Sequence, residues 1–151
     1  MRVTDRITGA GSWYHVNADH HVMALARHDF SHFHHLALEM TDWGELRVAF
    51  DHLAQHGRWL VWGPLRHGMG QNLCAYVRVP EEELMVEIYC DMEQLEPGHR
   101  PRDWDDTPHT SNTWGILPPR SWFRFDEAAL RSEREGLEAR GVPLPALGEP
   151  A

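Results

Sequence analysis

The first quarter of the chain alternates apolar and polar residues with a period of two, which is typical of β-strands. This alternation predicts strands over residues 1–8, 12–16, 20–26 and 34–40. Glycines at positions 9 and 11 predict a turn between the first two strands. The three residues 17–19, Asn-Ala-Asp, predict a short hairpin connection between the second and the third.

The period changes after residue 41 to that of an amphipathic helix. Asp42 and Glu45 have the spacing of a capping box, and Gly57 suits the first position beyond a helix end. Between them, apolar residues recur on one helix face: Leu46, Ala49, Phe50, Leu53 and Ala54. The sequence therefore predicts one helix between the strand at 34–40 and the rest of the chain.

Three further strands are predicted over 58–63, 72–79 and 84–90, the first ending at Gly63-Pro64. Alternation places Asn72, Cys74 and Tyr76 on one face of the second of these strands, and Met85, Glu87 and Tyr89 on one face of the third. Residues 34–90 thus follow the order βαβββ, and residues 1–26 resemble the last three strands of a similar unit. We predict an α+β fold of about one and a half βαβββ modules in a curved, partly open mixed sheet.

Four segments are expected along the chain. Residues 1–33 form a partial module that lacks its first strand and helix, and residues 34–91 form a complete one. Residues 92–140 form a C-terminal extension with a charged helix, and residues 141–151 a disordered tail. The extension contains Trp104, Trp114 and Trp122, which predicts that it packs over the body of the protein.

Composition narrows the classes of function. The chain has 14 basic and 23 acidic residues, a net charge of −9, which argues against a nucleic-acid or anionic-membrane surface. All the basic residues are Arg, so lysine chemistry is excluded. Neither a signal peptide nor an apolar run of about 18 residues is found, so we expect a cytoplasmic protein. Cys74 and Cys90 are expected to be buried reduced thiols.

Five residues in the predicted strands and loops are candidates for chemistry. Glu87 lies within an apolar strand, where a carboxylate is costly unless it is paired or bound to a metal, and His35 is a candidate partner. The alternative is a solvent-facing Glu87 and a structural His35. His67 and Tyr76 could together hydrogen-bond a phenolate, although each is also compatible with a structural role. Either His20 or His21 should face inward, and strand parity does not decide which.

The segments HHLALEM, GPLRHGMGQNLCAYVRVP and VEIYCD resemble the catalytic domain of the type I extradiol ring-cleavage dioxygenases. This family includes catechol, dihydroxybiphenyl and homoprotocatechuate 2,3-dioxygenases, within the vicinal-oxygen-chelate (glyoxalase-like) superfamily. The resemblance covers residues 2–125, including the segment SNTWGILPPRSWF. It implies tandem βαβββ modules around Fe(II), alternatively Mn(II), held by two histidines and one carboxylate, with a small aromatic diol and O₂ as substrates.

The resemblance also implies roles for individual residues. His35 and Glu87 would be metal ligands, His21 the acid–base residue, and His67 and Tyr76 the pair that hydrogen-bonds the substrate oxygen. Arg120, in the extension, is a candidate contact for a substrate carboxylate or else a surface residue. A homo-oligomer is also expected.

Two features depart from the family pattern. The spacing from Tyr76 to Glu87 is one residue longer than usual, which makes Glu83 a weaker rival for the carboxylate. The family's first metal histidine lies on a strand that precedes this sequence, and His15 lies on the wrong strand to replace it. Two other functions therefore stay open. One is a catalytically inactive, truncated and dimerising binding module, and the other is a different vicinal-oxygen-chelate enzyme, which would not need the His67–Tyr76 pair.

Overall fold

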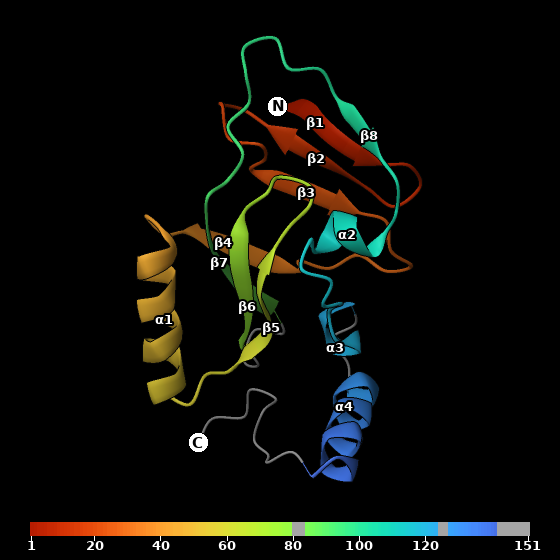
Figure 1. The fold of residues 1–151 in the computed structure, drawn as a ribbon. Coiled ribbons are helices and arrows are strands. Elements are labelled where there is room, and N and C mark those ends of the chain that lie inside the picture. Colours follow the sequence, from red (N-terminus) through yellow and green to blue (C-terminus); the bar gives the residue numbers. More distant parts are fainter. Residues whose placement is uncertain (80–83, 124–126, 142–151) are drawn as a thin grey trace.

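Two four-stranded sheets form the body of the protein in the computed structural model, which describes residues 1–79, 84–123 and 127–141 (Figure 1). The first sheet has the order β3-β2-β1-β8. Its strands are β1 (Arg2–Ile7), β2 (Gly11–His15), β3 (Met23–Ala26) and β8 (Arg102–Trp104). Strands β1 to β3 are antiparallel, whereas β8 runs parallel to β1.

The second sheet has the order β4-β7-β6-β5. Its strands are β4 (His35–Glu39), β5 (Leu60–Arg66), β6 (Leu73–Val79) and β7 (Leu84–Cys90), and α1 (Trp43–Gln55) connects β4 to β5. Only the β4–β7 pair is parallel. The predicted α+β class and the order βαβββ are confirmed, and the strands are divided between two sheets instead of following one another in a single sheet.

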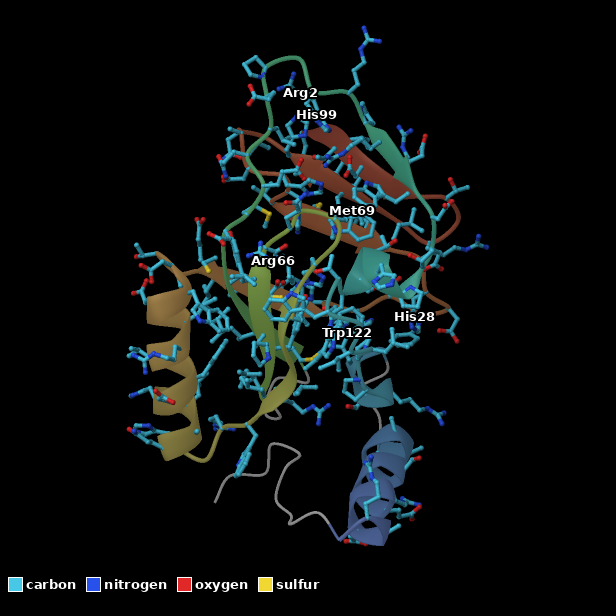
Figure 2. All side chains as sticks on the ribbon, viewed as in Figure 1. Arg2, His28, Arg66, Met69, His99 and Trp122 are labelled. Carbon is cyan, nitrogen blue, oxygen red and sulfur yellow. The ribbon has the colours of Figure 1, made fainter. Side chains whose placement is uncertain are left out.

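Side chains of β6 and β7 alternate between two apolar clusters, as the period of two requires. On one face, Leu73, Ile88 and Cys90 pack against Leu46 of α1. On the other face, Cys74, Tyr76 and Met85 pack with Trp62 and Leu65, and Trp122, labelled in Figure 2, packs against this cluster. Because the register places Tyr76 directly opposite Glu87, the second face also carries the polar residues of interest.

The helix α1 has the predicted ends. The Asp42 carboxylate accepts a hydrogen bond from the backbone N–H of Glu45 at 2.9 Å. The Glu45 carboxylate accepts from the backbone N–H of Thr41, one residue before the cap. Gly57 follows the C-cap with a φ of 69°, a left-handed conformation that glycine adopts without strain.

Two predicted strand limits are wrong. Strand β5 continues beyond Gly63-Pro64 to Arg66, with a shift of register between Trp62 and Leu65. A Cβ at position 63 would lie 2.7 Å from the Cβ of Ala75, so glycine lets the strand pass close to its neighbour. Strand β3 begins only at Met23, because Asp19 and His20 pair instead with a distant segment: the His20 N–H donates to the Glu93 carbonyl at 2.9 Å.

The C-terminal extension contains a strand that the sequence did not predict. Strand β8 joins the first sheet, and α2 (Pro108–Ser111), α3 (Arg120–Phe123) and α4 (Glu127–Ala139) follow it. The predicted tail lies outside the described residues apart from Gly141, and Glu83 also lies outside them. Within the part of the chain that is described, no helix is long and apolar enough to cross a membrane.

Candidate metal centre

Glu87 lies at the centre of a cluster of polar side chains on the inner face of β7. It is buried, and its two carboxylate oxygens face different neighbours. Oε2 is 3.2 Å from Nε2 of His35, whereas Oε1 accepts from Nδ2 of Asn72 at 2.9 Å and lies 3.8 Å from Nε2 of His67. Burial acts to raise the pKa of Glu87, but the hydrogen bond with His35 and the charge of His67 outweigh it and lower the pKa to about 2.

His34 fixes the ring of His35. The carbonyl oxygen of Trp122 can only accept, so Nε2–H of His34 donates to it at 2.6 Å. Burial lowers the pKa of His34 to about 4, so its ring is neutral and its Nδ1 is an acceptor. Nδ1–H of His35 donates to that acceptor at 2.7 Å.

The hydrogen bond from His35 to His34 also determines what Nε2 of His35 presents to Glu87. Because Nδ1 carries the proton, Nε2 of a neutral His35 presents a lone pair to the Glu87 carboxylate at 3.2 Å. Two acceptors at this separation require a proton or a cation between them. A histidine nitrogen and a carboxylate oxygen, with the histidine oriented by a second hydrogen bond, form a donor set that fits a divalent metal.

His67 and Tyr76 form a second hydrogen-bonded pair in the same cluster. Nδ1–H of His67 donates to the Ser111 carbonyl at 2.6 Å, so Nε2 accepts from the Tyr76 hydroxyl at 3.0 Å. Burial raises the pKa of Tyr76 and lowers that of His67. Tyr76 also contacts the His35 ring edge-on, with 5.4 Å between ring centroids. The structure therefore brings together the two pairs that the sequence singled out.

His20 and His21 repeat the arrangement of His34 and His35. Nε2–H of the fully buried His20 donates to the Asp5 carboxylate at 3.0 Å, and the Nδ1 atoms of the two histidines are 2.9 Å apart. Burial and the charge of His20 lower the pKa of His21 to about 4, and charges at Glu87, His67 and His35 also act on it. His21 is thus near the cluster. Because both histidines precede β3, strand parity does not separate them.

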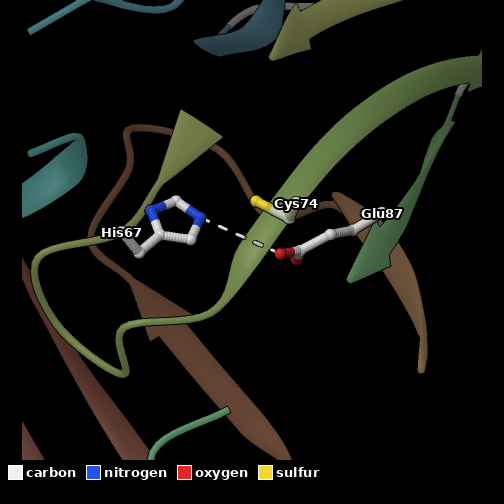
Figure 3. A group of neighbouring side chains, drawn as sticks. All are labelled: His67, Cys74 and Glu87. Atoms are coloured by element: carbon white, nitrogen blue, oxygen red, sulfur yellow. Dashed lines mark ion pairs between the residues drawn. The ribbon is translucent and has the colours of Figure 1, made fainter. Parts of the chain in front are cut away.

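Sequence reasoning missed three contributors to the cluster. His34, Asn72 and Cys74 were given no functional role, although Asn72 and Cys74 share the face parity of Tyr76. His67, Cys74 and Glu87 offer ligand atoms within 4.8 Å of one another (Figure 3). Arg120 is exposed at the start of α3 and makes no ion pair with another described residue. His15 hydrogen-bonds Thr4 in the first sheet.

Comparisons with known proteins show what the whole chain resembles. No family model matches the chain. The sequence is 30% identical over 131 residues to metapyrocatechase 2 of Cupriavidus necator, a match that covers 85% of this chain and 41% of that protein.

Solved structures show the same fold at 22% identity. The Mn(II)-bound glyoxalase of Novosphingobium aromaticivorans superposes with a TM-score of 0.72, covering 80% of this chain and 40% of that one. Homoprotocatechuate 2,3-dioxygenase of Arthrobacter globiformis superposes with a TM-score of 0.71, covering 82% and 41%. The chain thus spans about two-fifths of the length of these proteins. It is therefore similar to one part of these proteins, in sequence to metapyrocatechase 2 and in fold to the glyoxalase and to homoprotocatechuate 2,3-dioxygenase.

Proposed function

We propose that this chain carries metal-binding and proton-transfer residues of an extradiol dioxygenase that cleaves the ring of a small catechol-type diol with O₂. The observation that carries the proposal is the approach of His35 Nε2 to Glu87 Oε2, with the His67–Tyr76 pair beside it. The similarity to metapyrocatechase 2 supports the same reaction class, although only part of that protein is matched.

His35 and Glu87 are proposed as two protein ligands of Fe(II), alternatively Mn(II). These intermediate and hard ions accept imidazole nitrogen and carboxylate oxygen. When bound, the ion would supply a chelating centre for two neighbouring hydroxyls and a place for O₂ next to them. The hydrogen bond from His35 to His34 and that from Asn72 to Glu87 would hold both ligands in position.

His67 and Tyr76 are proposed to hold one oxygen of the diol. The raised pKa of Tyr76 keeps its hydroxyl protonated at neutral pH, so it can donate to a phenolate oxygen. Ser111 fixes the orientation of His67, which leaves Nε2 free to exchange Tyr76 for a substrate group. The pair therefore orients the substrate and favours its deprotonated oxygen.

His21 is proposed as the acid–base residue. Its lowered pKa makes it neutral at pH 7, so it can take a proton from a diol hydroxyl and later return it. Its Nδ1 contacts His20, which Asp5 anchors, and this arrangement would fix the orientation of the ring. His20 is thus a positioning residue in this assignment.

Anaerobic reconstitution tests the proposal. The purified chain is loaded with Fe(II), bound metal is measured, catechols and air are added, and formation of the yellow ring-opened product is followed. We expect colour in the wild type, loss of about 10²–10⁴-fold in rate in His21→Gln, and little change in the exposed control His32→Gln. If the rate falls more in His20→Gln than in His21→Gln, His20 is the acid–base residue and His21 is the positioning residue. Absence of both bound metal and colour would support a non-catalytic binding module instead.

Cytoplasmic location and homo-oligomeric assembly stay predictions. Light scattering would test the assembly.

A further inference from the structure

We propose a second metal site on the opposite side of Glu87, formed by His67, Cys74 and Glu87 and suited to a thiophilic divalent cation such as Zn(II). The inference goes beyond ring cleavage and does not depend on it. It starts from the two faces of the carboxylate: Oε2 faces His35, whereas Oε1 faces His67.

The geometry of the three side chains is close to that of a tetrahedral site. Their ligand atoms all lie within 4.8 Å of one another, and the His67 Nε2 to Glu87 Oε1 distance is 3.8 Å. Ligand atoms around tetrahedral zinc are roughly 3.3–3.8 Å apart, given bonds of about 2.0–2.3 Å. A small closure around the ion therefore suffices, and Figure 3 shows the ring, the thiol and the carboxylate gathered around one space.

The surroundings already orient two of the three ligands. The Ser111 carbonyl accepts from Nδ1–H of His67, which leaves Nε2 as the coordinating nitrogen. Nδ2 of Asn72 donates to Glu87. The amide oxygen of Asn72 is buried and makes no hydrogen bond to any described residue, although buried polar atoms are usually paired. A bound ion with its coordinated water would provide a partner for that oxygen.

The thiol decides which ion the site prefers. Cys74 is fully buried, and burial together with the charge of Glu87 opposes its ionisation in the absence of a cation. Binding of a divalent ion would release the thiol proton to the solvent and leave the thiolate on the metal. Thiolate, imidazole and carboxylate together favour zinc, whereas the His35 side of Glu87 offers only nitrogen and oxygen.

Occupation of this site would compete with the proposed reaction. The ion would take Nε2 of His67 from the Tyr76 hydroxyl, which now lies 3.0 Å away, and would also engage Glu87. Both groups would then be unavailable to a catechol and to iron. We therefore expect zinc to inhibit turnover in a manner that depends on Cys74.

Cobalt(II) binding to the apo-protein tests the inference, because cobalt replaces zinc and absorbs in the near ultraviolet when a thiolate is bound. We expect this charge-transfer band at about one equivalent of metal in the wild type, and also in Cys90→Ala, in which the other buried thiol is removed. The band should be absent in Cys74→Ala, with folding checked by circular dichroism. His35→Gln should keep the band, because His35 does not belong to this set.

Two results would overturn the inference. One is a folded wild-type protein with no thiolate band at saturating cobalt, and the other is a band that persists in Cys74→Ala. Either result leaves the proposed ring cleavage untouched, since that proposal is tested by iron-dependent product formation. The reverse outcome is also possible to recognise. If the chain shows the Cys74-dependent band but no ring-cleaving activity, the second metal site stands and the proposed function fails.

Discussion

Asp5 in the first sheet and Glu87 in the second are both buried carboxylates, but their partners differ in kind. Asp5 accepts from the guanidinium of Arg102 at 2.9–3.1 Å and from the Trp104 indole at 2.7 Å. Arg102 is always charged, and its other contacts reach Glu93 at 2.8 Å. Burial opposes ionisation of Asp5, yet the hydrogen bond from His20 at 3.0 Å, followed by those from Arg102 and Trp104, holds its pKa well below the ordinary value.

Glu87 has no guanidinium partner among the described residues. Its neighbours are His35, His67, Asn72 and the Cys74 thiol, which are all neutral or titratable groups. The charge of Asp5 is therefore already balanced by Arg102, and this ion pair joins β8 to β1. The Glu87 cluster can exchange a proton for a metal ion, because no permanent cation occupies it. The comparison teaches that the kind of partner, more than burial, separates a structural carboxylate from a functional one.

The largest expected effect of a substitution is on stability at Asp5. Asp5→Asn should lower the free energy of unfolding by about 3 kcal/mol, at the lower end of values for breaking a buried ion pair, because Arg102 is 38% exposed and recovers some hydration. Urea denaturation of the metal-free protein measures this change. A loss below about 1 kcal/mol would show that Arg102 does not determine the stability of the cluster.

Removing the residue that orients His35 should weaken metal binding. His34→Leu eliminates the Nδ1 acceptor, and we expect Fe(II) affinity to fall about 10–100-fold, as for other groups that hold a metal-binding histidine. His32→Leu is the matched control, because His32 is exposed on the preceding segment. Equal affinities for the two variants in anaerobic titration would contradict the assignment.

Acid should destabilise the metal-free protein in the range where the neutral histidines resist protonation. The pKa of His34 and that of His21 are lowered from 6.5 to about 4, so between these values the unfolded chain binds protons that the folded protein does not. Their contribution is complete above pH 6.5 and decreases as the pH falls toward 4. We expect a loss of about 3–4 kcal/mol between pH 7 and pH 5 from urea denaturation, roughly half from each histidine, and a loss about half as large in His34→Leu.

The smallest effect on stability is expected at Glu87. Glu87→Gln keeps an oxygen for Asn72 and gives His35 Nε2 an amide donor, so the free energy of unfolding of the metal-free protein should fall by less than it does in Asp5→Asn. Calorimetry or urea denaturation of Glu87→Gln and Asp5→Asn under the same conditions compares their free energies of unfolding. A loss as large as that of Asp5→Asn would show that both carboxylates are structural.

Much of the second sheet could be predicted because local pattern and tertiary structure agree there. Alternation along residues 72–79 and 84–90 placed Tyr76 and Glu87 on matching faces, and the register sets them opposite each other. Asp42 and Gly57 marked the ends of α1. The remaining features depend on contacts between distant residues: β8 pairs with β1 across nearly 100 positions, and the His34 ring bonds the Trp122 carbonyl.

The roles within the histidine pairs were also beyond local pattern. His20 and His21 precede β3, where no strand parity applies, and their orientation is set by Asp5 and the pairing of His20 with Glu93. The proximity of Cys74 to Glu87 required the strand register, which the sequence does not contain by itself. The residue types indicated metal chemistry. Only the structure shows that His35 lies at one carboxylate oxygen of Glu87 and His67 at the other.

Anaerobic equilibrium dialysis of Fe(II) against the wild type, Glu87→Gln and Asp5→Asn tests the central claim most directly. If Glu87 is the exchangeable carboxylate and Asp5 the structural one, the wild type will bind iron, Asp5→Asn will bind iron under conditions where it is folded, and Glu87→Gln will bind none at the same free concentration. Equal iron binding by the wild type and Glu87→Gln would contradict the account.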